Sequence, residues 1–218
     1  MFSAFIFDLD GVIADTESVQ LRAINLLLHP FGHRLTQEEW AREYVGHPIE
    51  EDVRVIQTRF GLETPLEILS ERRRALYRNL LQDGAGLQTL PGLDAFLDEL
   101  RERNIPLAIA SGSPRADIET VLQTLNLSER FNAIAAADEV AQPKPAPDVY
   151  LLATARLKIQ PHECLAIEDS ATGIAAAKSA GLQVAAIPSV YTRHQDLSKA
   201  DVLVGGFHEL SQMLSRRT

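Results

Sequence analysis

Four carboxylates in this sequence stand where short apolar runs end. Asp8 and Asp10 follow the apolar residues 4–7, and Glu168 and Asp169 follow the apolar residues 164–167. Runs of this length with polar boundaries are typical of buried parallel strands, and in open α/β sheets ligands bind at the carboxyl ends of the strands. Four carboxylates gathered there would repel one another unless a cation lies between them. Because the set offers only oxygen ligands, we expect Mg²⁺ to bind.

A lysine and a serine supply what a phosphate group would need beside the metal. Lys144 lies in the segment QPKPAPD (142–148), whose prolines stiffen the loop so that it can aim the ammonium group at a fixed target. Ser111 stands shortly before an expected helix N-terminus, where free backbone N–H groups favour an anion. Carboxylate, metal, lysine, hydroxyl and helix end together would form a cradle for a phosphoryl group.

Alternating strands and helices must bring these side chains to one edge. Further apolar runs at residues 107–110 and 184–187 predict strands, and residues 92–103, 114–125 and 171–180 predict helices between them. Ser113 is a predicted N-cap with Pro114 at the first helical position, and Gly181 is a predicted C-cap. The alternation from about residue 90 to 204 predicts an α/β fold with a doubly wound parallel sheet.

The stretch 16–87 has a different character. Residues 19–28 and 66–81 have helical patterns, but no strand alternates with them, and the segment DGAG (83–86) separates this stretch from the α/β part. We therefore expect two domains: a core formed by residues 1–15 and 88–218, and a small helical domain formed by residues 16–87.

The composition of the chain disfavours several kinds of partner. The chain has 218 residues, 45% of them hydrophobic, and a formal net charge of −9, which disfavours nucleic acid and anionic membranes as partners. The apolar residues near the start lack a basic region and are interrupted by Asp8 and Asp10, so neither a signal peptide nor a membrane span is expected. The single cysteine, Cys164, excludes an internal disulfide and fits a reducing compartment. We expect a cytoplasmic monomer that binds a small phosphorylated metabolite, and neither nucleic acid nor membrane.

Four motifs in this order resemble those of the haloacid-dehalogenase (HAD) superfamily, subfamily IA. They are DLDGV at 8–12, Ser111, Lys144 within KPAPD, and EDSATGI at 168–174, and their spacing covers nearly the whole chain. The subgroup that the chain resembles most contains β-phosphoglucomutase and small sugar-phosphate phosphatases. The resemblance implies a Rossmann-like core and a helical cap that closes over the site by hinging near Asp15 and Thr16.

The resemblance also implies a role for each matching residue. Asp8 would attack phosphorus to form an aspartyl-phosphate. Asp10 would protonate the leaving alcohol and then deprotonate the water that resolves the intermediate. Glu168 would contact the metal directly or stand one step behind it. The implied metal-binding residues are Asp8, Asp10 (through its carbonyl oxygen), Glu168 and Asp169, and the implied phosphate-binding residues are Ser111, Gly112 and Lys144.

Cap residues decide between a phosphatase and a mutase. β-Phosphoglucomutases carry a histidine where an ungapped comparison places Gln20, and an arginine after a cap glycine, where this chain reads GHPI (46–49). A neutral glutamine cannot act as a proton-linked switch near pH 7. We therefore predict a phosphatase, with a phosphosugar mutase as the alternative and a non-catalytic HAD-like binding protein as a remote one. Gln20 and His47 are the predicted substrate-facing residues of the cap. Arg73 stands where that family has a cap lysine.

The same residues also have structural interpretations without chemistry. Asp8 and Asp10 would then be turn residues after a strand, Glu168 and Asp169 would complement a helix dipole, and Ser111 and Lys144 would be loop residues. Cys164 is more readily a small buried hydrophobic residue than a reactive thiol.

Overall fold

Short apolar runs form the strands of one parallel sheet. The computed structural model describes residues 2–46, 49–84 and 86–215. Within this part of the chain six strands pair in the order β3-β2-β1-β4-β5-β6, and every pairing is parallel. The strands are β1 (Ala4–Phe7), β2 (Leu107–Ala110), β3 (Ala133–Ala135), β4 (Cys164–Glu168), β5 (Gln183–Ala186) and β6 (Val202–Leu203).

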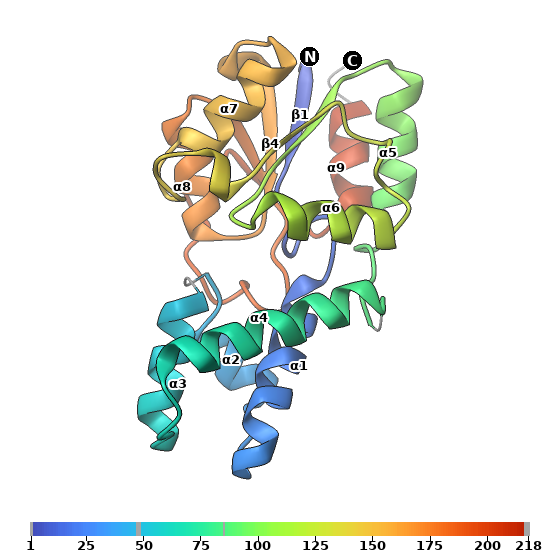
Figure 1. Ribbon diagram of the computed structural model, residues 1–218. Helices are drawn as coiled ribbons and strands as arrows, with labels where there is room; N and C mark the ends of the chain where they lie inside the picture. Colours follow the sequence, from blue (N-terminus) through green and yellow to red (C-terminus); the bar gives the residue numbers. More distant parts are fainter. Residues whose placement is uncertain (1, 47–48, 85, 216–218) are drawn as a thin grey trace.

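Helices cover both faces of this sheet, as Figure 1 shows. On one face α5 (Leu93–Glu102), α6 (Arg115–Thr124) and α9 (Phe207–Ser215) pack in a cluster with Phe5 and Phe7 of β1. On the other face α7 (Asp148–Leu157) and α8 (Ala171–Ser179) pack against Ala4 and Ile6. Alternate residues of β1 thus face opposite layers, as the period of a strand requires. This arrangement confirms the predicted α/β class with a doubly wound parallel sheet. The described residues also include three short 3₁₀ helices: η1 (His29–Phe31), η2 (Ala137–Glu139) and η3 (Pro161–Glu163).

One local prediction about α6 is wrong. Ser113 is not its N-cap: that position is Pro114, which makes no side-chain capping bond. The Ser113 hydroxyl instead donates a hydrogen bond to Oδ2 of Asp10 at 3.0 Å, and Asp138 accepts the N–H of Arg115 at 3.0 Å. A tertiary contact has therefore taken the hydroxyl that a local pattern assigned to the helix end. Gly181 follows α8 with φ +88°, in keeping with its predicted place at a helix C-terminus.

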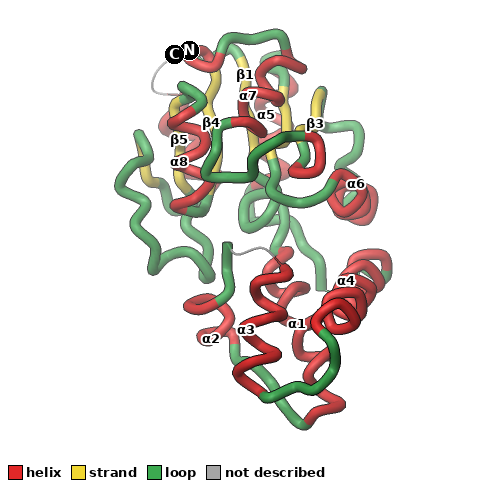
Figure 2. Tube along the Cα trace, turned by 60° about the vertical axis from the view of Figure 1, so that its left-hand side comes forward, coloured by secondary structure: helices red, strands yellow, loops and turns green. Residues whose placement is uncertain are grey.

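Four helices between β1 and α5 form a separate layer beyond the edge of the sheet where β1 ends (Figures 1 and 2). They are α1 (Thr16–Leu28), α2 (Gln37–Glu43), α3 (Ile49–Phe60) and α4 (Leu66–Gln82). Their apolar faces share a hydrophobic cluster that includes Trp40 and Tyr44, whose rings stack with centroids 5.3 Å apart. Aromatic pairs of this kind contribute about 0.5–1.5 kcal/mol beyond the area that they bury. The helical character of this stretch is as expected, and its status as a separate domain stays a prediction.

Two linkers connect this helical layer to the sheet, and they run side by side. The N–H of Asp15 donates to the carbonyl of Gln88 at 3.0 Å, and the N–H of Leu90 donates to the carbonyl of Ile13 at 3.2 Å. Asp15 also caps α1, since its side chain accepts the N–H of Ser18 at 3.1 Å. The first turn of α1 is thereby fixed relative to the sheet edge.

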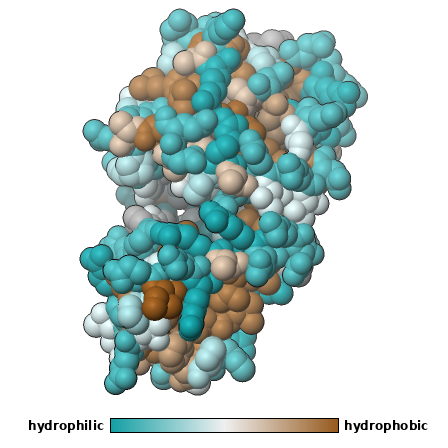
Figure 3. Space-filling model, viewed as in Figure 1, coloured by the Kyte–Doolittle hydropathy of each residue, from teal (hydrophilic) through white to brown (hydrophobic). Residues whose placement is uncertain are grey.

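The surface of the described residues is mostly hydrophilic on the face drawn in Figure 3. In this view the molecule is narrower where the helical layer meets the sheet part. Large apolar side chains that are exposed on the helical layer include Leu26 and Ile68. No helix in the described ranges is long and apolar enough to cross a membrane.

Candidate active site

The carboxylates predicted from the sequence meet where β1 and β4 end. These strands are neighbours, with Phe7 in register with Ile167, and the N–H of Asp8 donates to the carbonyl of Ile167 at 2.9 Å. One oxygen each from Asp8, Glu168 and Asp169 lie within 4.8 Å of one another, and all three residues are buried. The parallel pairing of two strands far apart in sequence thus builds the acidic cluster.

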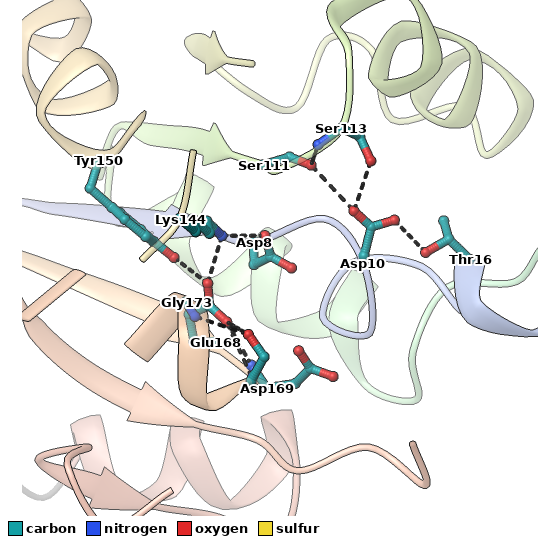
Figure 4. A network of polar contacts seen from close by, with 11 residues as sticks. Asp8, Asp10, Thr16, Ser111, Ser113, Lys144, Tyr150, Glu168, Asp169 and Gly173 are labelled. Atoms are coloured by element: carbon teal, nitrogen blue, oxygen red, sulfur yellow. Dashed lines mark hydrogen bonds and ion pairs between the residues drawn. The ribbon is translucent and has the colours of Figure 1, made fainter. Parts of the chain in front are cut away.

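Lys144 reaches into this cluster from the loop before α7. Its Nζ lies 2.7 Å from Oδ1 of Asp8 and 2.7 Å from Oε1 of Glu168. The ammonium group therefore bridges the ends of β1 and β4, as Figure 4 shows.

Glu168 has both carboxylate oxygens occupied by protein donors. Oε1 accepts the Tyr150 hydroxyl at 2.7 Å in addition to Lys144. Oε2 accepts the N–H of Asp169 at 3.1 Å and the N–H and hydroxyl of Ser170 at 3.3 and 3.1 Å. Its carboxylate also lies so close to the backbone of Gly173 that a Cβ there would collide with it. Glu168 is held in one orientation at the start of α8.

Asp169 is held from two sides. Its Oδ2 accepts the Thr192 hydroxyl at 3.1 Å, and it lies against Gly11, where a Cβ would collide with it and where φ is +77°. Only glycine adopts that φ readily and leaves room for the carboxylate. The DLDG sequence therefore needs its glycine for space as well as for its turn.

Burial shapes the electrostatics of the cluster. It raises the pKa of Asp8 from 3.8 to about 8, because Lys144 offsets only part of the cost of burial and Glu168 adds to it. Burial, with the charges of Glu168 and Asp8, raises the pKa of Asp169 well above its ordinary value. Burial disfavours the Lys144 ammonium too, but the carboxylates of Asp8 and Glu168 outweigh it and raise its pKa. One ammonium group, in contact with Asp8 and Glu168, thus lies in this acidic cluster, and a further positive charge would stabilise the ionised forms of Asp8 and Asp169.

The side chain of Asp10 belongs to a second network beside the first (Figure 4). Oδ1 accepts the Thr16 hydroxyl at 2.5 Å, and Oδ2 accepts the hydroxyls of Ser111 and Ser113 at 3.3 and 3.0 Å. Ser111 is fully buried and accepts the N–H of Ser113 at 2.9 Å. The side chain of Asp10 is thus engaged outside the acidic cluster, and the metal contact predicted for its carbonyl oxygen stays a prediction.

The helical layer contains polar side chains, and one of them, Glu17, interacts electrostatically with Asp10 and Asp169. Arg73 is 2% exposed and donates through Nη2 to Oε1 of Gln20. Trp40 donates its indole N–H to Glu17 at 2.7 Å. Burial raises the pKa of Glu17 to about 7, with Asp10 among the charges that act on it, and Glu17 acts in turn on Asp169.

The predicted binding residues are only partly brought together. Asp8, Lys144, Glu168 and Asp169 form one network and Asp10 with Ser111 the next. Gln20 is bound to Arg73 in the helical layer. Gly112 is exposed at the end of β2, with open space at its Cβ position. His47 lies outside the described residues.

Several contributors were missed by reasoning from the sequence. Thr16 and Glu17 stand directly after the Asp15 cap, where a polar first helical turn gave a usable signal. Tyr150 and Thr192 carried no such signal, because each meets its carboxylate across the fold, 18 and 23 residues away in sequence.

The acidic cluster fits a divalent cation. Its donors are oxygens only, its members are buried, and burial disfavours the ionised forms of Asp8 and Asp169 unless positive charge is added. Because the protein already fills the acceptor capacity of Glu168, oxygens of Asp8 and Asp169 are the ones left to face an ion.

Fold, motifs and site define a class of hydrolase. Residues 5–187 match the family model described as haloacid dehalogenase-like hydrolase. The chain belongs to this family, which confirms the predicted superfamily and its enzymatic character.

Individual relatives span nearly the same length. Protein CbbY of Rhodobacter capsulatus is 36% identical over 210 residues, 91% of this chain and 90% of the relative. β-Phosphoglucomutase of Bacillus subtilis is 34% identical over 188 residues, 82% of this chain and 80% of the relative. The crystal structure of CbbY from Rhodobacter sphaeroides with xylulose-1,5-bisphosphate matches with a TM-score of 0.83 at 30% identity, covering 96% of both chains.

Proposed function

We propose that this protein is a Mg²⁺-dependent phosphatase that hydrolyses a small phosphorylated sugar or a similar ester through an aspartyl-phosphate on Asp8. The observation that carries the proposal is the network of Asp8, Lys144 and Glu168 at the ends of β1 and β4, with Asp10 held beside it by separate hydroxyl groups. A nucleophile and an acid–base group are thus fixed independently of each other.

The proposed reaction has two displacements. In the first, an oxygen of Asp8 forms a bond to phosphorus while the ester P–O bond breaks, and Asp10 gives a proton to the leaving oxygen. In the second, water attacks phosphorus, Asp10 takes its proton, and the bond to Asp8 breaks to release phosphate. Lys144 stays against Asp8 and faces the charge of the phosphoryl group in both steps.

Asp8 and Asp169 are the proposed Mg²⁺ ligands, and Glu168 orients Lys144 and the start of α8. When bound, the metal would supply positive charge to the carboxylates and to the phosphoryl oxygens. This assignment rests on the acceptors of Glu168, which five protein donor groups already engage.

We propose the division into a core, residues 1–15 and 88–218, and a cap, residues 16–87. The cap residues share a hydrophobic cluster that Tyr191 of the core also enters, and two adjacent linkers join the cap to the core. We infer that the cap selects the substrate. Arg73 supports a substrate with a polar or second anionic group, since it is buried and its Nη1 has no hydrogen-bond partner among the described residues. Relatives with sugar bisphosphate and phosphosugar substrates in their names agree with this class.

Phosphate release from a panel of esters tests the proposal. The panel should contain xylulose 1,5-bisphosphate, other sugar phosphates, and β-glucose 1-phosphate with and without glucose 1,6-bisphosphate, each with MgCl₂. We expect free phosphate from one or a few esters, none from Asp8→Asn, and loss of activity in excess chelator that MgCl₂ restores.

Two results would contradict the proposal. Glucose 6-phosphate formed from β-glucose 1-phosphate without net phosphate release would identify a mutase instead. Substantial turnover by a folded Asp8→Asn variant would refute Asp8 as the nucleophile.

A further inference from the structure

The segment between β5 and β6 connects the helical layer to the acidic cluster. Figure 1 shows this segment, in orange, extending from the sheet toward the helices. Tyr191 is 5% exposed, and its side chain belongs to the hydrophobic cluster of α1–α4 that also contains Trp40. The next residue, Thr192, is 1% exposed and donates its hydroxyl to Oδ2 of Asp169 at 3.1 Å. Two consecutive residues therefore contact the cap and a proposed metal ligand.

Hydrogen bonds link the backbone of Tyr191 to that carboxylate. The N–H of Tyr191 donates to Oγ of Ser189 at 3.2 Å, and Oγ of Ser189 lies 3.0 Å from Oγ1 of Thr192. A threonine hydroxyl has one proton. Because Thr192 gives that proton to Asp169, its Oγ1 is an acceptor toward Ser189, whose N–H donates to it at 3.0 Å. The 189–192 turn thus contacts Asp169 through the Thr192 hydroxyl, and the side chain of Ser189 also acts on that carboxylate.

The segment is stiff enough to transmit a displacement. The N–H groups of Thr192 and Arg193 both donate to the carbonyl of Ser189, at 3.3 and 3.1 Å, which closes a tight turn. Gln195 donates its N–H to the carbonyl of Thr192 at 2.8 Å and accepts the first N–H of α8, that of Ala171, at 2.9 Å. Tyr191 and Thr192 are thus held in one rigid turn that is fastened beside Asp169.

We propose that Thr192 is a positioning residue that orients Asp169 for the metal, and that the packing of Tyr191 in the cap makes this orientation depend on the position of the cap. The inference rests on the proposed metal site. By bonding to Oδ2, Thr192 holds the carboxylate of Asp169 in one orientation. Binding of the ion and seating of the cap then favour each other, because both require the same placement of the 189–192 turn.

Calorimetric titration with MgCl₂ tests the proposal without any substrate. Removing an outer partner of a metal ligand costs about 10–100-fold in metal affinity, so we expect Thr192→Val to weaken Mg²⁺ binding by at least about tenfold. Thr192→Ser keeps the hydroxyl and should restore affinity to within about twofold. Tyr191→Ala should weaken binding several-fold, and it should add little in the Thr192→Val background, since both changes break one connection. Tyr191→Phe, which keeps the buried ring, and Val190→Ala, at a side chain 54% exposed, should bind as the unaltered protein does.

A spectroscopic signal reports on the cap separately. Trp40 is the only tryptophan of the chain and shares its cluster with Tyr191, so Mg²⁺ should change its fluorescence in the unaltered protein and not in Tyr191→Ala. Absence of Mg²⁺ binding by the unaltered protein would overturn the metal site and this inference with it. Binding by the unaltered protein with equal affinity in Thr192→Val, or losses that simply add in the double variant, would overturn this inference alone. If Thr192→Val does not fold, the contrast between Tyr191→Ala and Tyr191→Phe decides the matter.

Discussion

Gly173→Ala should destabilise this protein, although the same change in most helices has the opposite effect. Gly173 is the third residue of α8, and alanine is favoured over glycine inside a helix by about 1 kcal/mol. Here a Cβ would collide with the carboxylate of Glu168, which is fully buried. The carboxylate cannot move aside without breaking its bonds to Lys144 and Tyr150.

The magnitude follows from these opposing effects. Overpacking a rigid site costs about 1–3 kcal/mol, and each lost hydrogen bond to a charged group costs about 1.5–3 kcal/mol. With one of these bonds lost, and after subtraction of the gain in helix propensity, we expect a net loss of about 1.5–5 kcal/mol. At about 2–4 °C per kcal/mol for a chain of this size, the melting temperature should fall by about 3–20 °C. Turnover should also fall by at least about tenfold, because Lys144 loses the partner that aims it at Asp8.

Thermal unfolding followed by circular dichroism, with urea unfolding and phosphatase assays in parallel, measures both effects. Gly206→Ala is the matched control, because a Cβ there meets nothing within 4 Å, and its stability should change by less than about 0.5 kcal/mol. If Gly173→Ala melts at or above the temperature of the unaltered protein and keeps full activity, the inferred contact with Glu168 is wrong.

Three further predictions concern charge and hydrogen bonding. Burial raises the pKa of Asp52 from 3.8 to about 8, and the charge of Arg73 offsets only part of this shift. Between pH 3.8 and about pH 8 the folded state therefore binds more protons than the unfolded chain does. The free energy of unfolding consequently falls as the pH rises through this window. Asp52→Asn should accordingly raise the melting temperature at pH 8 and change it little near pH 4, and an equal shift at both values would contradict this. Tyr150→Phe removes one donor to the Glu168 carboxylate and should cost about 1.5–3 kcal/mol in urea unfolding, whereas unchanged stability would show that the bond contributes nothing. MgCl₂ should raise the melting temperature more at pH 8 than at pH 6, because the ion competes with protons for buried carboxylates; a shift that is the same at both values, or that a chelator does not reverse, would count against the metal site.

The fold was readable from the sequence wherever an apolar run was long enough to be a strand on its own. The bounds of β1 and β2 are those predicted, while β3 and β6 were missed because they have three and two residues. The alanine-rich sequence AIA of β3 favours a helix by local propensity, and only its pairing with β2 makes it a strand. Ser113 illustrates the same limit, since a contact with Asp10 replaced its local capping role.

In the candidate site, too, local patterns predicted some residues and tertiary contacts brought in the others. Asp8, Glu168 and Asp169 were predictable because strand ends in a parallel sheet meet at one edge. The hydroxyl donors that fix them were not, because Tyr150 lies inside a helix and Thr192 in a loop, and neither stands at a position that a strand end defines. The prediction that Gln20 faces the substrate stays a prediction, and its bond to Arg73 depends on the packing of α1 against α4, which no local pattern gives.

The central position of β1 has a consequence for the newly synthesised chain. The strand that precedes Asp8 is synthesised before both of its neighbours in the sheet, which contribute Leu107 and Cys164 as the partners of Phe5 and Ala4. Helices α1–α4 contact residues that are closer in sequence than the partners of β1 are, so we expect these helices to pack first. Until β2 and β4 are synthesised, both edges of the apolar strand Ala4–Phe7 lack their hydrogen-bond partners. During that interval the strand is an apt target for a chaperone and a source of aggregation. Proteolysis of ribosome-arrested chains that end before and after residue 168 would show protection of this strand only in the longer ones.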